Sequence, residues 1–139
     1  MMAKSKNLIP PDDFCGDKTF QKWEGEMKKG NQGAFKKLIQ SATETDGCLA
    51  DEWASSVTRI RKEIPEFFYL NLQKENKDIR EFMLYTVVRE WDLYDENSPE
   101  LFNALDQLIE KYKSDKKRSV FLHSCRTYMQ DLTKRRFGE

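Results

Sequence analysis

Apolar residues recur along most of the chain at the three- and four-residue spacing of amphipathic helices. This pattern predicts helices over several ranges, separated by polar or Gly- and Pro-containing breaks: 17–29, 34–42, 49–62, 65–75, 78–94, 98–112 and 116–136. Pro65 cannot sit inside a helix without a kink, so we expect a kink or a helix boundary there. No alternation of useful length predicts a strand. We therefore predict an all-α fold, a single compact bundle of about five to six helices.

The range 78–94 is the most apolar of these segments, which indicates the central helix of the bundle. In the last helix, the spacing directs either Phe121 or Leu122 inward, and either Tyr128 or Met129. The residues that we expect to be largely buried are Phe82, Val87, Trp91, Leu105, Leu108 and Tyr128.

The first 16 residues show no helical period and contain two adjacent prolines followed by two adjacent aspartates. We therefore expect 1–16 to be a flexible N-terminal arm. Asp17 has a side chain suited to capping the helix that follows. The helical bundle domain is predicted to cover 17–139.

Charge is plentiful but unevenly spread. Charged residues make up 35% of the 139 residues, and the formal net charge is zero. From Lys111 to Glu139, nine Lys or Arg stand against three Asp or Glu, so this stretch carries +6 and the remainder carries −6. Such asymmetry indicates an anionic partner or head-to-tail contact between copies of the chain. A solvated helix whose basic end suits its own dipole is the alternative.

The cysteines Cys15, Cys48 and Cys125 are odd in number and far apart, and no Cys-x-x-Cys occurs. The sequence therefore predicts neither a disulfide framework nor a zinc site. The lysines near the N-terminus are not followed by an apolar run, and no stretch approaches the length needed to cross a bilayer. We expect a cytoplasmic protein that does not enter the membrane.

Catalytic patterns are missing from the sequence. The single histidine, His123, lies among apolar residues, and it cannot form a dyad with Cys125 because residues two apart on a helix face different sides. There is no Gly-rich phosphate loop, Gly-x-Ser-x-Gly or His-Glu-x-x-His. We expect no enzymatic activity, no cofactor, no metal and no small-molecule substrate.

Basic residues near hydroxyls and aromatics are the candidate recognition surface. Arg binds phosphate through paired hydrogen bonds, and Ser and Thr hydroxyls donate to the same oxygens. The predicted RNA-binding residues are Ser56, Thr58, Arg59, Arg61, Arg89, Arg126, Lys134 and Arg135. The alternative is a set of ordinary surface pairs that stabilise helices, which fits Arg59 and Glu63 at a four-residue spacing.

These residues also carry a family resemblance. The stretch Ser56-Val57-Thr58-Arg59-Ile60-Arg61 resembles the Thr-Thr-Ser-x-hydrophobic-Arg signature of the small helical subunit of type III (Csm-type) CRISPR effector complexes. The pair Arg89-Glu90 resembles the end of that family's second helix. The last helix and its finish are similar at Phe121, Cys125, Arg126, Tyr128, Met129 and Lys134-Arg135-Arg136-Phe137-Gly138. The resemblance covers 49–139, with departures at Pro65 and Val57.

The resemblance implies a non-catalytic subunit of an RNA-guided antiviral complex. Several copies would line the guide-RNA filament and hold the guide or target RNA by backbone contacts, beside the other effector subunits. The opposed charges of the two chain portions would suit head-to-tail self-association. The alternative is a helical protein–protein adaptor or inhibitor, for example a phage-encoded one, with no nucleic-acid role. Zero net charge favours that alternative, because a free-standing nucleic-acid binder is usually basic.

Overall fold

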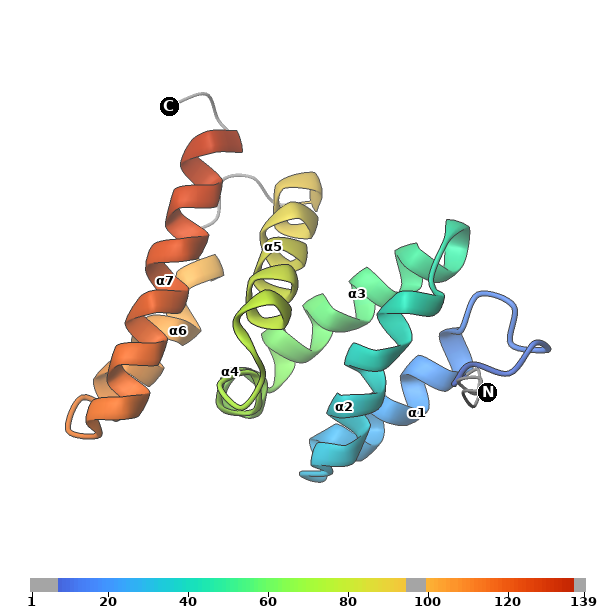
Figure 1. Ribbon diagram of the computed structural model, residues 1–139, viewed down its shortest axis with the longest axis horizontal. Helices are drawn as coiled ribbons and strands as arrows, with labels where there is room; N and C mark the ends of the chain where they lie inside the picture. The colour runs from blue at the N-terminus through green and yellow to red at the C-terminus, as the bar shows by residue number, and fades with distance from the viewer. Residues whose placement is uncertain (1–7, 95–99, 137–139) are drawn as a thin grey trace, which may run out of the picture. The chain divides into compact units, whose positions relative to one another are not determined.

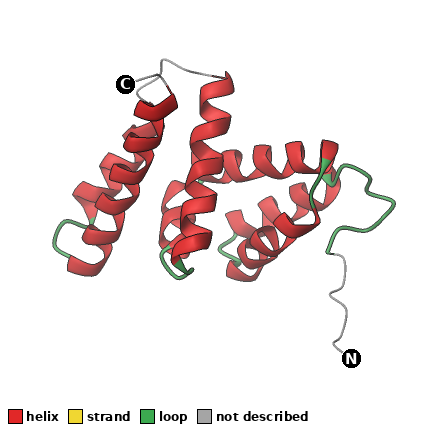
Figure 2. Ribbon diagram, turned by 45° about the horizontal axis from the view of Figure 1, so that its top comes forward, coloured by secondary structure: helices red, strands yellow, loops and turns green. Residues whose placement is uncertain are grey.

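The computed structural model describes residues 8–94 and 100–136, and it contains no strand within these ranges (Figures 1 and 2). Seven α-helices and one short 3-10 helix, η1 (Ala42–Glu44), make up the described chain. The α-helices are α1 (Asp17–Lys28), α2 (Gln32–Ser41), α3 (Gly47–Glu63), α4 (Pro65–Leu72), α5 (Lys77–Tyr94), α6 (Glu100–Lys111) and α7 (Lys116–Arg136). The predicted all-α class is confirmed, and the predicted count of five to six helices is too low.

The chain divides into two compact units, Met1–Ser56 and Val57–Glu139. In the first unit α1 packs against α2, and in the second α7 packs against both α5 and α6 while α4 contacts α6. The boundary lies inside α3, a continuous helix. The hydrophobic pattern predicted one bundle because a boundary within a helix leaves no break in that pattern.

The first unit is built around an apolar stripe on α1. Phe20, Trp23 and Met27 are buried, and the rings of Phe20 and Trp23 meet edge to face with centroids 5.8 Å apart. Edge-to-face pairing is the arrangement that aromatic quadrupoles prefer. The indole Nε1 of Trp53 donates a 2.7 Å hydrogen bond to the carbonyl oxygen of Leu38. This bond satisfies a buried donor and ties α3 to the end of α2.

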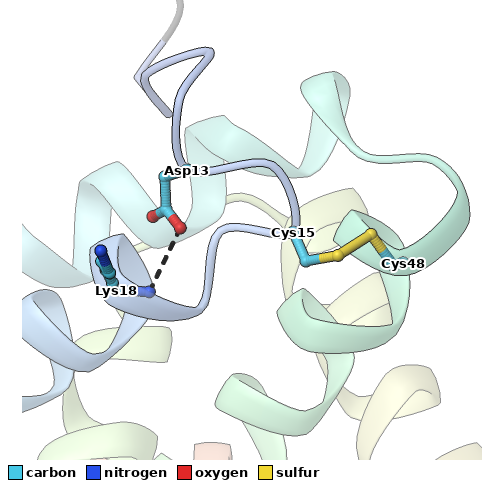
Figure 3. The surroundings of a disulfide bond; sticks show 4 residues. All are labelled: Asp13, Cys15, Lys18 and Cys48. Atoms are coloured by element: carbon cyan, nitrogen blue, oxygen red, sulfur yellow. Dashed lines mark hydrogen bonds between the residues drawn. A yellow bond between two sulfur atoms is a disulfide. The ribbon is translucent and has the colours of Figure 1, made fainter.

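The segment before α1 supplies the cap of that helix. The Asp13 carboxylate accepts a hydrogen bond from the backbone N–H of Lys18 at 3.4 Å (Figure 3). It accepts a second from the backbone N–H of Thr19 at 2.7 Å. It also accepts a 2.6 Å bond from the Thr19 hydroxyl. Burial acts to raise the pKa of Asp13, but these hydrogen bonds hold it below its ordinary value. The prediction that Asp17 is the cap is wrong, because Asp17 already lies in the first turn.

A disulfide fixes the same segment. Cys15 in the loop is bonded to Cys48 in the first turn of α3, with Cα atoms 5.3 Å apart (Figure 3). Next to it Gly16 has φ 79°, and a Cβ there would lie 2.6 Å from Cδ1 of Leu49. The disulfide and the Asp13 hydrogen bonds therefore tie this loop to α3 and α1, while the flexibility that we expect of 1–16 stays a prediction. The sequence did not predict the pairing, because it brings together cysteines 33 positions apart.

The disulfide also bears on the expected location. Disulfides persist in oxidising compartments and are rare in the cytosol. The bond therefore weighs against the cytoplasmic expectation, which stays a prediction. Across the described ranges, no helix combines the length and the apolar character that crossing a membrane requires.

The second unit resolves the alternatives left open for its last helix. Leu122 and Met129 are fully buried, whereas Phe121 and Tyr128 are half-exposed.

The predicted burial of Val87, Leu105 and Leu108 is confirmed. Tyr128 is only partly covered, so its predicted burial is confirmed in part. Phe82 is 49% exposed, so its predicted burial is wrong. Phe82 shares a face of α5 with Tyr85 and Arg89, all of which are exposed. Trp91 lies outside the residues whose side chains are described.

The predicted boundary at Pro65 is confirmed, since this proline occupies the first turn of α4. Hydrogen bonds then connect the first turn of α4 to the end of α6. The Glu66 carboxylate accepts a 2.8 Å bond from Nζ of Lys111 and a hydrogen bond from the Tyr112 hydroxyl. These two donors hold the pKa of Glu66 below its usual range.

Replacing both bonded cysteines by Ser should lower the free energy of unfolding by about 2–4 kcal/mol, because the cross-link restricts the unfolded chain. Urea unfolding measures this loss. Reductant should bring the wild type to the stability of the double variant and leave the stability of the variant unchanged.

Cys125 is free and buried, and burial raises its pKa to about 12. Denatured without reductant, the protein should therefore show one titratable thiol, and three would contradict the bond.

Candidate nucleic-acid interface

The Ser/Thr-Arg cluster of α3 does not form an exposed surface. Ser56 is fully buried, and its hydroxyl donates a 2.6 Å hydrogen bond to Oε2 of Glu24. Arg61 is 2% exposed, and its Nη1 donates to the Leu101 carbonyl oxygen at 3.5 Å. Neither side chain reaches solvent. In this structure neither is on a surface that an RNA backbone could contact, as we expected both to be. Thr58 and Arg59 are half-exposed.

Arg126 is committed to a neighbouring helix. Its guanidinium forms two bonds to the Asp106 carboxylate, from Nε at 2.5 Å and from Nη2 at 3.2 Å. It also lies 4.7 Å from the centroid of the Phe102 ring. The bond to Asp106 raises the pKa of Arg126 above its ordinary value. Arg126 therefore ties α7 to α6, and its charge is largely neutralised.

Two of the remaining predicted residues, Arg89 and Lys134, are exposed. The Arg89 side chain is exposed, and its Nη2 lies 3.6 Å from the Glu90 carboxylate. Lys134 is exposed near the end of α7. Arg135 lies outside the residues whose side chains are described. The RNA-binding roles of these exposed residues stay predictions.

A different part of the second unit is hollowed and basic. Figure 1 shows α7 running beside α5. Side chains of both helices line a groove along this pairing. It consists of two adjoining open hollows of about 520 Å³ and about 640 Å³, which share Arg80, Phe121 and Ser124. We call the two together the α5–α7 groove.

The charge of the groove changes along its length. The larger hollow has three cations and no carboxylate in its lining, which is formed by Gln73, Arg80, Lys116, Lys117, Val120, Phe121 and Ser124. The smaller hollow is mixed in charge, since Glu81 and Asp131 line it together with Lys77 and Arg80. Positive potential is therefore concentrated at the end where α7 begins.

Ion pairing explains why these lysines differ from the other C-terminal cations. Four members of the basic stretch pair with carboxylates: Lys111 with Glu66, Lys113 with Glu110, Arg118 with Asp115 and Arg126 with Asp106. Among the described residues, no ion pair involves Lys116 or Lys117, and both are exposed. Their charges remain available to an anionic ligand.

Backbone and ring contacts position the other groove residues. Nη1 of Arg80 donates a 2.6 Å hydrogen bond to the Glu75 carbonyl oxygen, and the guanidinium lies 5.8 Å from the Phe121 ring centroid. This arrangement holds a cation near an aromatic ring. Phe121 and Ser124 lie at the groove because Leu122 and Cys125 occupy the buried side of α7.

The sequence pattern alone does not assign these cations to a site. Lys116 and Lys117 belong to the basic stretch, and the spacing of α7 leaves Phe121 as an alternative for the core. The groove depends on the pairing of α5 with α7, which brings Arg80 beside positions 116–124. A helical projection of α7 alone does not supply that neighbour.

No protein-family model, curated protein or solved structure matches the chain. Within the described part of the chain, no three His, Cys, Asp or Glu side chains are grouped so that they could hold a metal ion. The groove must therefore be interpreted from its own chemistry.

Arg61→Ala should lower the free energy of unfolding by about 1–3 kcal/mol, because it removes a buried side chain and its hydrogen bond to the Leu101 carbonyl oxygen. Its exposed neighbour provides the control, since Lys62→Ala should change stability by less than about 0.5 kcal/mol. Chemical denaturation measures both. Equal stabilities for the two variants would show that Arg61 is not packed as described.

Proposed function

We propose that the protein is a non-catalytic nucleic-acid-binding subunit that holds RNA through the α5–α7 groove. The observation that carries the proposal is the larger hollow, which Arg80, Lys116 and Lys117 line together with the Phe121 ring and without any carboxylate. Such a surface is complementary to a phosphate chain and contains nothing arranged to cleave it.

The contacts would be insensitive to sequence. Lysine ammonium groups meet phosphates as mobile point charges, and arginine adds a planar fork of donors. Neutralising phosphates releases condensed counterions, so affinity of this kind falls as salt rises. None of these groups needs a base edge, and contacts to phosphates fix position without reading bases.

A net charge of zero limits the affinity for RNA that the protein would have on its own. A protein with no excess of positive charge gains little long-range attraction to a polyanion. Two or three phosphate contacts therefore suit a subunit whose partners add further contacts, because linked weak sites reinforce one another. This supports a role inside a ribonucleoprotein complex over that of a free-standing binder.

The finer form of the proposal is a small subunit of a type III CRISPR effector complex. Phe121 and Tyr128, which line the groove, belong to the last-helix segment that carries the resemblance. In that assembly the groove would face the guide or target RNA along the filament. Other effector subunits would supply catalysis.

A protein–protein adaptor or inhibitor is the second candidate, and one observation favours it. Phe82 and Tyr85 on α5 are 49% and 40% exposed and share a face with Arg89. Aromatic and arginine side chains are enriched where proteins bind one another. RNA binding that depends on the groove lysines separates the two candidates.

Lys116→Gln with Lys117→Gln should weaken binding of a fluorescent RNA strand about tenfold at low salt. It should also flatten the slope of log affinity against log salt by roughly 0.7 for each phosphate that is no longer neutralised. Lys62→Gln with Lys113→Gln, which changes net charge equally outside the groove, should leave affinity near the wild-type value. Fluorescence anisotropy across a salt series measures both. If the two double variants bind alike, the groove is not the site; if the wild type binds no RNA alone or within its assembled complex, the adaptor candidate replaces the proposal.

A further inference from the structure

The geometry points to a single strand, not a duplex, as the ligand of the α5–α7 groove, with one base stacked on the Phe121 ring and neighbouring phosphates at Lys116 and Lys117. This inference rests on the proposed function and specifies the form of nucleic acid that the groove accepts. Apolar surface lying among the cations is the feature that distinguishes the two forms.

That surface has no use in binding a duplex. Val120 is 62% exposed and Phe121 is half-exposed, and both line the hollow that holds the three cations. In a duplex the flat faces of the bases are covered by one another, so a protein meets phosphates, sugars and base edges. In a single strand the faces are free, and aromatic side chains commonly bind them by stacking.

Arg80 reinforces the stacking position. Its guanidinium lies 5.8 Å from the Phe121 centroid, and the bond to the Glu75 carbonyl limits where it can move. Guanidinium planes and aromatic rings both stack with bases, and neither distinguishes one base from another. Base stacking at this point is therefore compatible with binding that does not depend on sequence.

The spacing of the groove residues along α7 matches the separation between the phosphate and the base of one nucleotide. Lys117 and Phe121 are four residues apart, so they lie on one face, separated by roughly 6 Å along the helix axis. Lys116 and Val120 repeat the same relation, and Ser124 follows Phe121 on the groove side. A phosphate at the first turn of α7 would place its base near the next turn, where the ring lies.

The test compares one mixed-sequence RNA strand, alone and annealed to its complement, on the full chain. We expect the single strand to bind at least tenfold more tightly than the duplex. Phe121→Ala should weaken single-strand binding about tenfold while leaving the salt slope unchanged, because every cation that meets a phosphate is still present. Tyr85→Ala is the matched control, since it removes an exposed aromatic of the same unit outside the groove lining.

A second variant guards against loss of folding in Phe121→Ala. Phe121→Trp keeps an aromatic ring, so it should retain single-strand affinity, and its added fluorescence should be quenched by the strand and not by the duplex. Duplex binding as tight as single-strand binding would overturn the inference and leave the proposed function standing. Unchanged affinity in a folded Phe121→Ala, or no quenching in Phe121→Trp, would also overturn it. Failure of both RNA forms to bind would overturn the proposed function itself.

Discussion

The register of α7 in the second unit determines which of its side chains are available to a ligand. Leu122, Cys125 and Met129 recur at three- and four-residue spacing and are buried. Each residue turns the helix by about 100°, so a shift of one position would carry Phe121 into the core. The packing that stabilises this unit is thus the same packing that leaves Phe121 and Tyr128 half-exposed at the groove.

The basic residues on the two sides of α7 have different surroundings. Toward α6, Arg126 is bound by the Asp106 carboxylate and covered by the Phe102 ring. Toward α5, Lys116 and Lys117 line a hollow without carboxylates. The surplus of positive charge in the last part of the sequence is therefore divided, with one part holding the unit together and the other left to solvent. A count of basic residues alone does not separate these parts.

Local features of the sequence predicted local features of the fold. The predicted bounds of the last helix agree with the structure, and Pro65 marks a helix start. Features that depend on distant partners were not predicted. Arg61 is buried against the carbonyl of a residue 40 positions away, and Cys15, in the loop before α1, is bonded to a cysteine in α3. The groove belongs to the same class, because Arg80 reaches Phe121 through the pairing of α5 and α7.

Photocross-linking tests directly whether nucleic acid lies in the groove. An RNA strand carrying 4-thiouridine would be irradiated with the folded protein, and tryptic peptides would then be mapped by mass spectrometry. Trypsin cleaves after Arg118 and Arg126, so Val120, Phe121 and Ser124 of the groove lining are contained in one peptide. We expect the main adduct on that peptide, reduced by excess unlabelled single strand. Adducts confined to helices of the first unit, with none on this peptide, would contradict it.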